Sequence, residues 1–272
     1  MTATDMAPDQ PVIRVRGLVK RFGDHAVHDG VNLDVMRGEV IGIVGGSGTG
    51  KSVLLRQIVG LLKPDAGTIE VLGQSVRDTP EAQYRRLRRR WGVMFQDGAL
   101  FSSLTVRQNV EAPMREQMDL AEDLRVTLAA LKVRMVGLPD DAQHKYPAEL
   151  SGGMRKRAGF ARAIALDPEI VFLDEPTAGL DPIGAAAFDT LIRQLQAALG
   201  LTVFLVTHDL DSLYAICDRV AVLADARVLA VGTLADMQQV DHPWVREYFN
   251  GPRARAAAAT ASARPTEPAE EP

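Results

Sequence analysis

A glycine-rich segment early in the chain has the spacing of a loop that binds phosphate groups. It fits the pattern G-x-x-x-x-G-K-[ST] and reads Gly45-Gly46-Ser47-Gly48-Thr49-Gly50-Lys51-Ser52. Glycines let successive N–H groups turn toward phosphate oxygens, and the start of a helix adds partial positive charge. Lys51 would contact the β and γ phosphates of a nucleoside triphosphate, and the Ser52 hydroxyl would bind Mg²⁺. A glycine-rich turn without a ligand is the alternative, but it does not explain the Lys-Ser pair.

Two adjacent carboxylates, Asp174 and Glu175, follow the apolar run Ile170–Leu173. The carboxyl end of a strand is where α/β proteins bind ligands. Asp174 would hold the hydration shell of Mg²⁺, and Glu175 would polarise the water that attacks the γ phosphate. An acidic pair of this kind is about as often a solvated turn, so its interpretation as a magnesium and base site depends on the phosphate loop.

Strand-like segments alternate with helical ones around these motifs, which predicts an α/β fold with a mostly parallel sheet. Apolar or β-branched runs of strand length occur at 12–18, 40–44, 170–173, 202–206, 220–223 and 227–231. Apolar residues at helical spacing predict two helices whose stripes face the core. The first stripe is Leu120, Leu124, Leu128, Leu131 and Met135; the second is Phe188, Leu191, Ile192, Leu195 and Leu199. Residues 97–165 show helices without strands, so we expect an inserted helical lobe.

Composition and charge exclude several classes of function. The chain has 272 residues and a net charge of −4, so it lacks the basic footprint of a nucleic-acid binder. No apolar run reaches the roughly 20 residues that span a bilayer, and the first residues lack the pattern of a signal peptide. The single cysteine, Cys217, cannot form an intramolecular disulfide, as expected in a reducing cytosol. Residues 1–11 and 251–272 are predicted to be disordered.

A further motif, Leu150-Ser151-Gly152-Gly153-Met154, narrows the interpretation. Together with the phosphate loop, Gln96, the acidic pair and His208, it resembles the nucleotide-binding domains of ABC transporters over residues 12–235. The resemblance implies a P-loop core with a mostly parallel sheet, additional antiparallel strands and an inserted helical subdomain at about 97–165, within an ATPase domain at 12–250. It also implies that Ser151, Gly152 and Gly153 cap the γ phosphate of ATP held by a second copy of the chain, so hydrolysis requires a dimer.

The same resemblance assigns roles to single residues. Phe22 would stack on adenine, although a strand-end core residue is the alternative. Gln96 would contact Mg²⁺ and the attacking water, and His208 would contact the γ phosphate and orient Glu175. The segment Ala178–Asp181 would cross the dimer interface, while Asp181 also begins the following helix as its N-cap.

Two departures point to one branch of the family. Met154 stands where most members carry Gln, and residues 97–104 read Asp-Gly-Ala-Leu-Phe-Ser-Ser-Leu. Together with residues 178–183, these features resemble the ATPases of MCE-associated (Mla-type) phospholipid transport systems. The resemblance implies a peripheral protein at the cytoplasmic face of a bacterial inner membrane. Its partners would be transmembrane permease subunits, an MCE-domain lipid-binding protein and a small regulatory subunit. Residues 97–115 would dock a coupling helix of the permease.

Other interpretations stay open at this stage. The chain could serve an importer of another solute, because substrate contacts lie in the permease. A non-transport ABC ATPase is less favoured, since those proteins generally carry two cassettes or long insertions. The basic run at 85–90 is interpreted as a solvated helix face rather than a lipid-headgroup or nucleic-acid site. Residues 244–249 predict a short amphipathic helix that packs on its own domain or, alternatively, clasps a partner.

Overall fold

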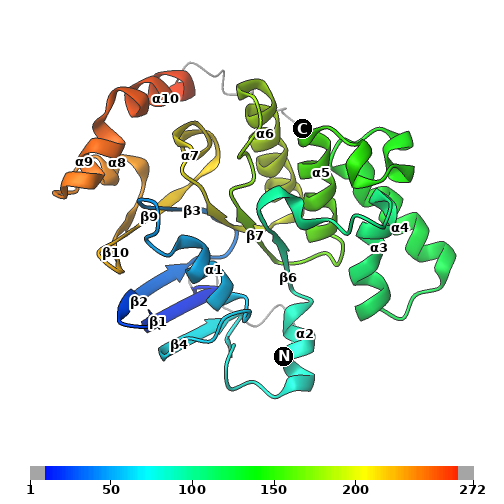
Figure 1. The fold of residues 1–272 in the computed structure, drawn as a ribbon, viewed down its shortest axis with the longest axis horizontal. Coiled ribbons are helices and arrows are strands. Elements are labelled where there is room, and N and C mark those ends of the chain that lie inside the picture. Colours follow the sequence, from blue (N-terminus) through cyan, green and yellow to red (C-terminus); the bar gives the residue numbers. More distant parts are fainter. Residues whose placement is uncertain (1–9, 263–272) are drawn as a thin grey trace, which may run out of the picture.

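The computed structural model of the protein describes residues 10–262, in which helices surround two β-sheets (Figure 1). The larger sheet has six strands in the order β10-β9-β3-β8-β7-β6, and all neighbouring pairs except β9 and β10 are parallel. Its strands are β3 (Val40–Val44), β6 (Trp91–Met94), β7 (Ile170–Asp174), β8 (Thr202–Val206), β9 (Arg219–Ala224) and β10 (Arg227–Gly232). The predicted mostly parallel α/β sheet is confirmed.

The smaller sheet is antiparallel, with four strands in the order β2-β1-β4-β5. Its strands are β1 (Ile13–Phe22), β2 (His25–Val35), β4 (Ala66–Val71) and β5 (Gln74–Ser75). Only β1 is predicted by its own alternating pattern. The pairing of β2 with β1 shifts register between Val15 and Leu18, and a bulged strand carries no regular alternation in sequence.

The helices lie on both faces of the larger sheet and at one side of it (Figure 1). They are α1 (Lys51–Ile58), α2 (Glu81–Arg88), α3 (Val106–Gln117), α4 (Glu122–Met135), α5 (Gly152–Ala163), α6 (Pro182–Leu199), α7 (Leu210–Ile216), α8 (Leu234–Met237), α9 (Pro243–Asn250) and α10 (Pro252–Ser262), with short 3-10 turns η1 (Gln96–Ala99), η2 (Asp140–His144) and η3 (Pro147–Glu149). Between β6 and β7 the chain is helical, and α3, α4 and α5 pack on one another at the side of the sheet. That residues 97–165 form a separate inserted subdomain stays a prediction.

The helix α4 buries a different face from the one predicted. Leu124 and Leu131 are 46% and 49% exposed, whereas Ala129 and Val133 are buried. The helix therefore turns small side chains toward α3 and α5, which allows three helices to pack closely around one core. Lys132 on the same inner face is buried as well, and its ammonium pairs with Asp167. The interpretation of the whole leucine stripe as core is wrong for two of its members.

The helix α6 follows its prediction more closely. Its buried positions include Phe188, Leu191, Ile192 and Leu195, and Leu199 at the end of the helix is 40% exposed. The side chain of Asp181 accepts a hydrogen bond from the Gly184 N–H at 2.9 Å, so the predicted N-cap forms.

Most of the basic run at 85–90 lies on an exposed surface, as predicted, but Arg90 is half-buried and pairs with Glu169. The helix α2 packs on the hydrophobic core through Leu87, which is 1% exposed. Its exposed arginines are Arg85, Arg86 and Arg88, with Arg89 just beyond the helix end.

The C-terminal segment contradicts the prediction of a disordered tail over part of its length. Residues 252–262 form α10, which packs on α7 and α9 and buries Ala254 and Ala257. Alanine has the highest intrinsic helix propensity, so an alanine-rich segment that finds a surface folds readily. Residues 1–9 and 263–272 lie outside the described residues, and with them most of the predicted disorder. Across residues 10–262, each helix is too short or too polar to cross a bilayer.

Candidate active site

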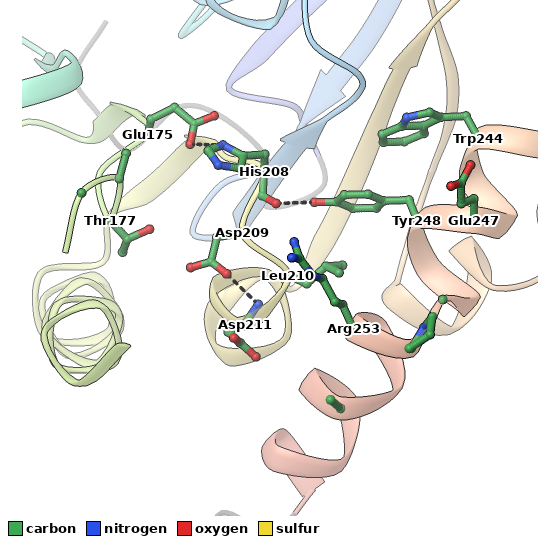
Figure 2. Close-up of a pocket in the computed structure, with 15 residues that line it drawn as sticks. Glu175, Thr177, His208, Asp209, Leu210, Asp211, Trp244, Glu247, Tyr248 and Arg253 are labelled. Atoms are coloured by element: carbon green, nitrogen blue, oxygen red, sulfur yellow. Dashed lines mark hydrogen bonds and ion pairs between the residues drawn. The ribbon is translucent and has the colours of Figure 1, made fainter. Parts of the chain in front are cut away.

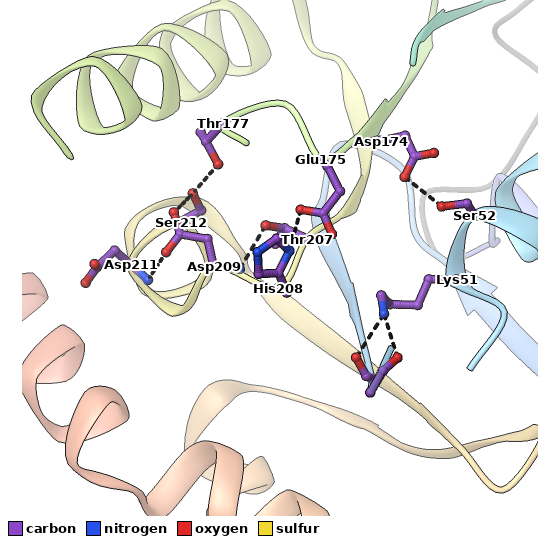
Figure 3. Close-up of polar contacts among 12 residues, drawn as sticks. Lys51, Ser52, Asp174, Glu175, Thr177, Thr207, His208, Asp209, Asp211 and Ser212 are labelled. Atoms are coloured by element: carbon purple, nitrogen blue, oxygen red, sulfur yellow. Dashed lines mark hydrogen bonds and ion pairs between the residues drawn. The ribbon is translucent and has the colours of Figure 1, made fainter. Parts of the chain in front are cut away.

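The parallel strands of the larger sheet bring the predicted site residues to one edge. Val206 in β8 pairs with Ile43 of β3 on one side and with Asp174 of β7 on the other. Because these three strands run in the same direction, the residues that follow them leave the sheet side by side. The phosphate loop, the acidic pair and His208 are therefore neighbours, although they lie far apart in the sequence (Figure 3).

The phosphate loop is closed by its own lysine. Lys51 Nζ donates hydrogen bonds to the carbonyl oxygens of Gly45 and Gly46, each at 2.9 Å. Burial lowers the pKa of Lys51, against the opposing effect of the carboxylates Glu175 and Asp174. A partly desolvated ammonium above a glycine loop attracts an anion strongly, because little water remains to screen it. This geometry suits the phosphate chain of a nucleotide.

Two oxygen donors face each other beside the loop. The Ser52 hydroxyl donates to Asp174 Oδ1 at 3.0 Å, and Asp174 is only 5% exposed. Burial raises the pKa of Asp174, with the Ser52 hydrogen bond opposing that shift. Hydroxyl and carboxylate oxygens are hard ligands of the kind that Mg²⁺ prefers, with phosphate oxygens and water as its other ligands. In the part of the chain that the structure describes, no group of three or more His, Cys, Asp or Glu residues could hold a metal unaided.

Glu175 and His208 form a second polar pair at the same edge. His208 Nδ1 lies 2.8 Å from Glu175 Oε2, and the His208 side chain is 70% exposed while that of Glu175 is 16% exposed. Glu175 has φ +50°, a left-handed conformation that is strained for a residue with a side chain. Its N–H donates to the Val206 carbonyl at 2.8 Å and its carbonyl accepts from Lys156 Nζ at 3.2 Å. These bonds fix the main chain at Glu175, and the contact with His208 orients its carboxylate.

The predicted γ-phosphate cap lies on a different element. Ser151 is exposed at the N-terminus of α5, where its hydroxyl accepts a hydrogen bond from the Met154 N–H at 3.2 Å. Gly152 and Gly153 form the first turn of the helix, so their N–H groups point outward at its positive end. Within residues 10–262, no hydrogen bond joins Ser151 to the phosphate loop.

Phe22 and Gln96 occupy the margins of the site. Phe22 ends β1 and is 51% exposed, with Lys20 Nζ 5.4 Å from its ring centroid, so its interpretation as a core residue is wrong. Gln96 follows β6 and is exposed in η1. Because Met94 pairs with Leu173, Gln96 lies at the same sheet edge as the acidic pair.

Sequence reasoning missed a buried histidine beneath the phosphate loop. His28 is fully buried, with Nδ1 2.8 Å from Gln57 Oε1 and Nε2 3.1 Å from the Gly50 carbonyl oxygen. Gln57 Nε2 is buried without a partner. Turning the Gln57 amide over lets it donate to Nδ1, while Nε2–H donates to Gly50, so one neutral tautomer satisfies both ring nitrogens. The only sign of a buried His28 in the sequence is a polar residue among the apolar positions of a strand.

The neutral state of His28 predicts a pH-dependent stability. Burial lowers its pKa, against smaller opposing effects of Gln57 and Gly50. An unfolded chain binds a proton near pH 6.5 that the folded chain does not, so the free energy of unfolding falls below about pH 6.5. We expect this loss, at most about 1.4 kcal/mol per pH unit, to diminish in a His28→Leu, Gln57→Leu variant. Denaturant unfolding from pH 7.5 to 5.5 measures it.

The double variant should fold, because the Gly50 carbonyl still accepts a hydrogen bond from the Leu54 N–H at 2.8 Å. Replacing both partners of a buried polar pair by apolar groups is often nearly neutral. A variant whose stability falls as steeply with acid as that of the unaltered protein would show that His28 does not cause the loss.

The chain is similar to a known protein family and to several known proteins. Residues 28–178 match the family described as ABC transporter. The chain is 39% identical over 241 residues to the "Probable ribonucleotide transport ATP-binding protein mkl" of Mycobacterium leprae (strain TN), covering 89% of this chain and 69% of that protein. It is also 39% identical over 243 residues to the "Intermembrane phospholipid transport system ATP-binding protein MlaF" of Haemophilus influenzae, covering 89% of this chain and 92% of that protein.

A solved structure shares the fold. It is described as the dimeric structure of a post-hydrolysis state of the ATP-binding cassette MJ0796 bound to ADP and Pi. It superimposes with a TM-score of 0.74 at 29% identity, covering 81% of this chain and 98% of that one.

Proposed function

Because the chain belongs to the ABC transporter family, as an ATP-binding and ATP-hydrolysing subunit, we propose that it drives phospholipid transport between the two membranes of a bacterial envelope. The observation that carries this proposal is the likeness to MlaF, which extends over 92% of that protein. The resemblance of Met154 and residues 97–104 to Mla-type ATPases favours the same branch.

For hydrolysis, Glu175 accepts a proton from the attacking water as the water oxygen bonds to the γ phosphorus. The bond from that phosphorus to the β–γ bridging oxygen breaks, and MgADP and phosphate result. His208, 2.8 Å from Glu175, keeps the carboxylate oriented and contacts the γ phosphate. Lys51 and the N–H groups of residues 45–52 offset the negative charge that develops on the phosphate oxygens.

Ser52 and Asp174 would hold Mg²⁺ through their facing oxygens, and Gln96 follows β6 at the same sheet edge. When bound, the ion neutralises phosphate charge and polarises the transferring group. The hydrogen bond between Ser52 and Asp174 keeps both oxygens directed at the same point beside the loop. Phe22, exposed at the end of β1, provides a flat face on which adenine can stack.

Two copies of the chain would form the working unit, with each ATP held between them. The exposed position of Ser151 at the positive end of α5 supports a role toward another subunit's nucleotide. The solved cassette with the same fold is dimeric. Each phosphate loop is then one half of a composite site that Ser151, Gly152 and Gly153 of the second copy complete.

A permease would dock beside the helical region, at the inner face of the membrane. A groove of about 300 Å³ there is lined by Trp91, Phe101, Pro113, Arg162 and Leu166 among others. Phe101 is 55% exposed, with the Arg162 guanidinium carbon 5.7 Å from its ring centroid. An apolar floor with an exposed aromatic residue suits a short helix from a partner. Leu100, by contrast, is half-buried in the core, so only Phe101 offers a clean test.

Affinity purification of the full chain from native membranes tests the proposal. We expect it to retain transmembrane permease subunits, an MCE-domain protein, a small regulatory subunit and bound phospholipid, all identified by mass spectrometry. Phe101→Glu should lose these chains, whereas Leu229→Glu, an exposed apolar residue on β10, should keep them. Both variants should keep ATP-dependent dimerisation.

The competing candidate is transport of another solute, since the relative named for ribonucleotide transport is equally identical at 39%. Recovery of permease subunits with a ribonucleotide-binding partner and no lipid would overturn the phospholipid proposal. Recovery of ribosomes or DNA in place of membrane proteins would overturn the transport function itself.

A further inference from the structure

The helix α9 reaches His208, which lies beside the phosphate loop and the acidic pair. It is anchored on its own domain through Val245 and Phe249, both buried, as the sequence favoured. On its other face, the Tyr248 hydroxyl donates a hydrogen bond to the main-chain carbonyl of His208 at 2.9 Å (Figure 2). The helix α9 therefore holds the backbone of His208, whose side chain contacts Glu175.

A second aromatic residue connects this contact to the phosphate loop. Trp244 stacks on Tyr248 with ring centroids 4.7 Å apart and an angle of 15° between the planes. The Trp244 Nε1 atom lies 3.6 Å from the position that a Cβ on Gly46 would occupy. The indole thus lies against the loop on one side and against the tyrosine ring on the other.

We propose that Tyr248 is a positioning residue for His208, and that Trp244 and Tyr248 together form an aromatic bridge that transmits the position of the phosphate loop to His208. The proposal rests on the role given above to His208 and deepens it. The His208 ring is 70% exposed, so packing alone does not orient it. Fixing its carbonyl sets the plane of the peptide after it, and this limits the directions in which the imidazole can point.

The surroundings favour a persistent bond. Tyr248 is half-buried, so little water competes with the His208 carbonyl for the tyrosine hydroxyl. The bridge forms one wall of a cavity of about 1040 Å³ whose opposite wall contains Glu175 and Thr177 (Figure 2). Both ends of the bridge therefore meet groups that act on ATP.

Removing the Tyr248 hydroxyl tests the first part of the proposal, the hydrogen bond from Tyr248 to His208. Tyr248→Phe keeps the stack on Trp244 but deletes the hydrogen bond, and we expect kcat for ATP hydrolysis to fall about fivefold with KM for ATP nearly unchanged. Tyr84→Phe is the matched control, because the Tyr84 hydroxyl also donates to a main-chain carbonyl, that of Val59 at 3.3 Å, away from the site. Equal kcat values for the two variants would overturn the proposal.

A double-mutant cycle separates this proposal from the role of His208. If Tyr248 acts through His208, adding Tyr248→Phe to His208→Ala lowers kcat no further. A further fivefold loss of kcat when Tyr248→Phe is added to His208→Ala would refute the action of Tyr248 through His208. If His208→Ala alone keeps normal turnover, the proposed function of His208 fails. If His208→Ala is inactive while Tyr248→Phe is normal, only the positioning role fails.

Tryptophan fluorescence tests the second part of the proposal, the contact between Trp244 and the phosphate loop. The chain has two tryptophans, so Trp91→Phe leaves Trp244 as the single emitter. Because its indole lies against Gly46, saturating ATP should shift or quench the Trp244 emission, and Tyr248→Phe in the same background should leave that response in place. Emission that stays constant through an ATP titration, while binding is detected independently, would rule out the bridge.

Discussion

Glu175→Gln is expected to lower ATP turnover by about 10²- to 10⁴-fold, which is the usual contribution of a general base. Glutamine has the same shape but accepts protons poorly, so the attacking water loses its base. His208 Nδ1, 2.8 Å from Glu175 Oε2, can still donate to an amide oxygen at that position, so the geometry should persist. ATP binding should therefore be retained, and the ATP-bound dimer should accumulate because it is not hydrolysed.

Phosphate release and size-exclusion chromatography with MgATP measure both effects. Glu70→Gln serves as the control, because Glu70 lies on β4 in the antiparallel sheet, where it pairs with Arg14 at 3.4 Å. It should keep normal turnover and a reversible dimer. Turnover of Glu175→Gln within about fivefold of the unaltered chain would show that another group accepts the proton.

The sheet edge that carries this chemistry was predictable from sequence. The strands β3 and β8 have the predicted limits, and β7 differs only by including Asp174. Each is short and mostly apolar, and glycine or polar residues follow it at once. A strand buried on both faces has no alternation and ends where the chain reaches solvent. The motifs could thus be placed at one edge before their contacts were known.

The remaining features depend on tertiary contacts that leave weak traces in sequence. The face that α4 buries was mispredicted because Leu131 is as apolar as a core residue, and only packing against α3 and α5 selects Ala129 instead. The helix α10 was missed because composition alone does not reveal that α7 offers it a surface. Tyr248 reaches the His208 carbonyl across 40 residues of sequence, a contact that no local pattern signals.

The proposed composite site predicts the second large effect. Two variants that are each inactive should restore activity when they are mixed. Lys51→Ala removes the ammonium that faces the phosphates, so binding of ATP should be largely lost. Ser151→Asp keeps a good N-cap for α5 but sets a negative charge against the γ phosphate. Each variant alone should be nearly inactive.

Mixing the two variants should recover activity, because one site of a mixed dimer combines the intact loop of one copy with the intact Ser151 of the other. Random pairing of a two-fold dimer gives half mixed dimers with one good site each, so the recovered ATPase rate should approach about a quarter of normal. Ser151→Thr, which keeps the hydroxyl cap, is the control and should stay active. A mixture as inactive as its components would mean that Ser151 serves the nucleotide of its own chain, since then no pairing contains a complete site.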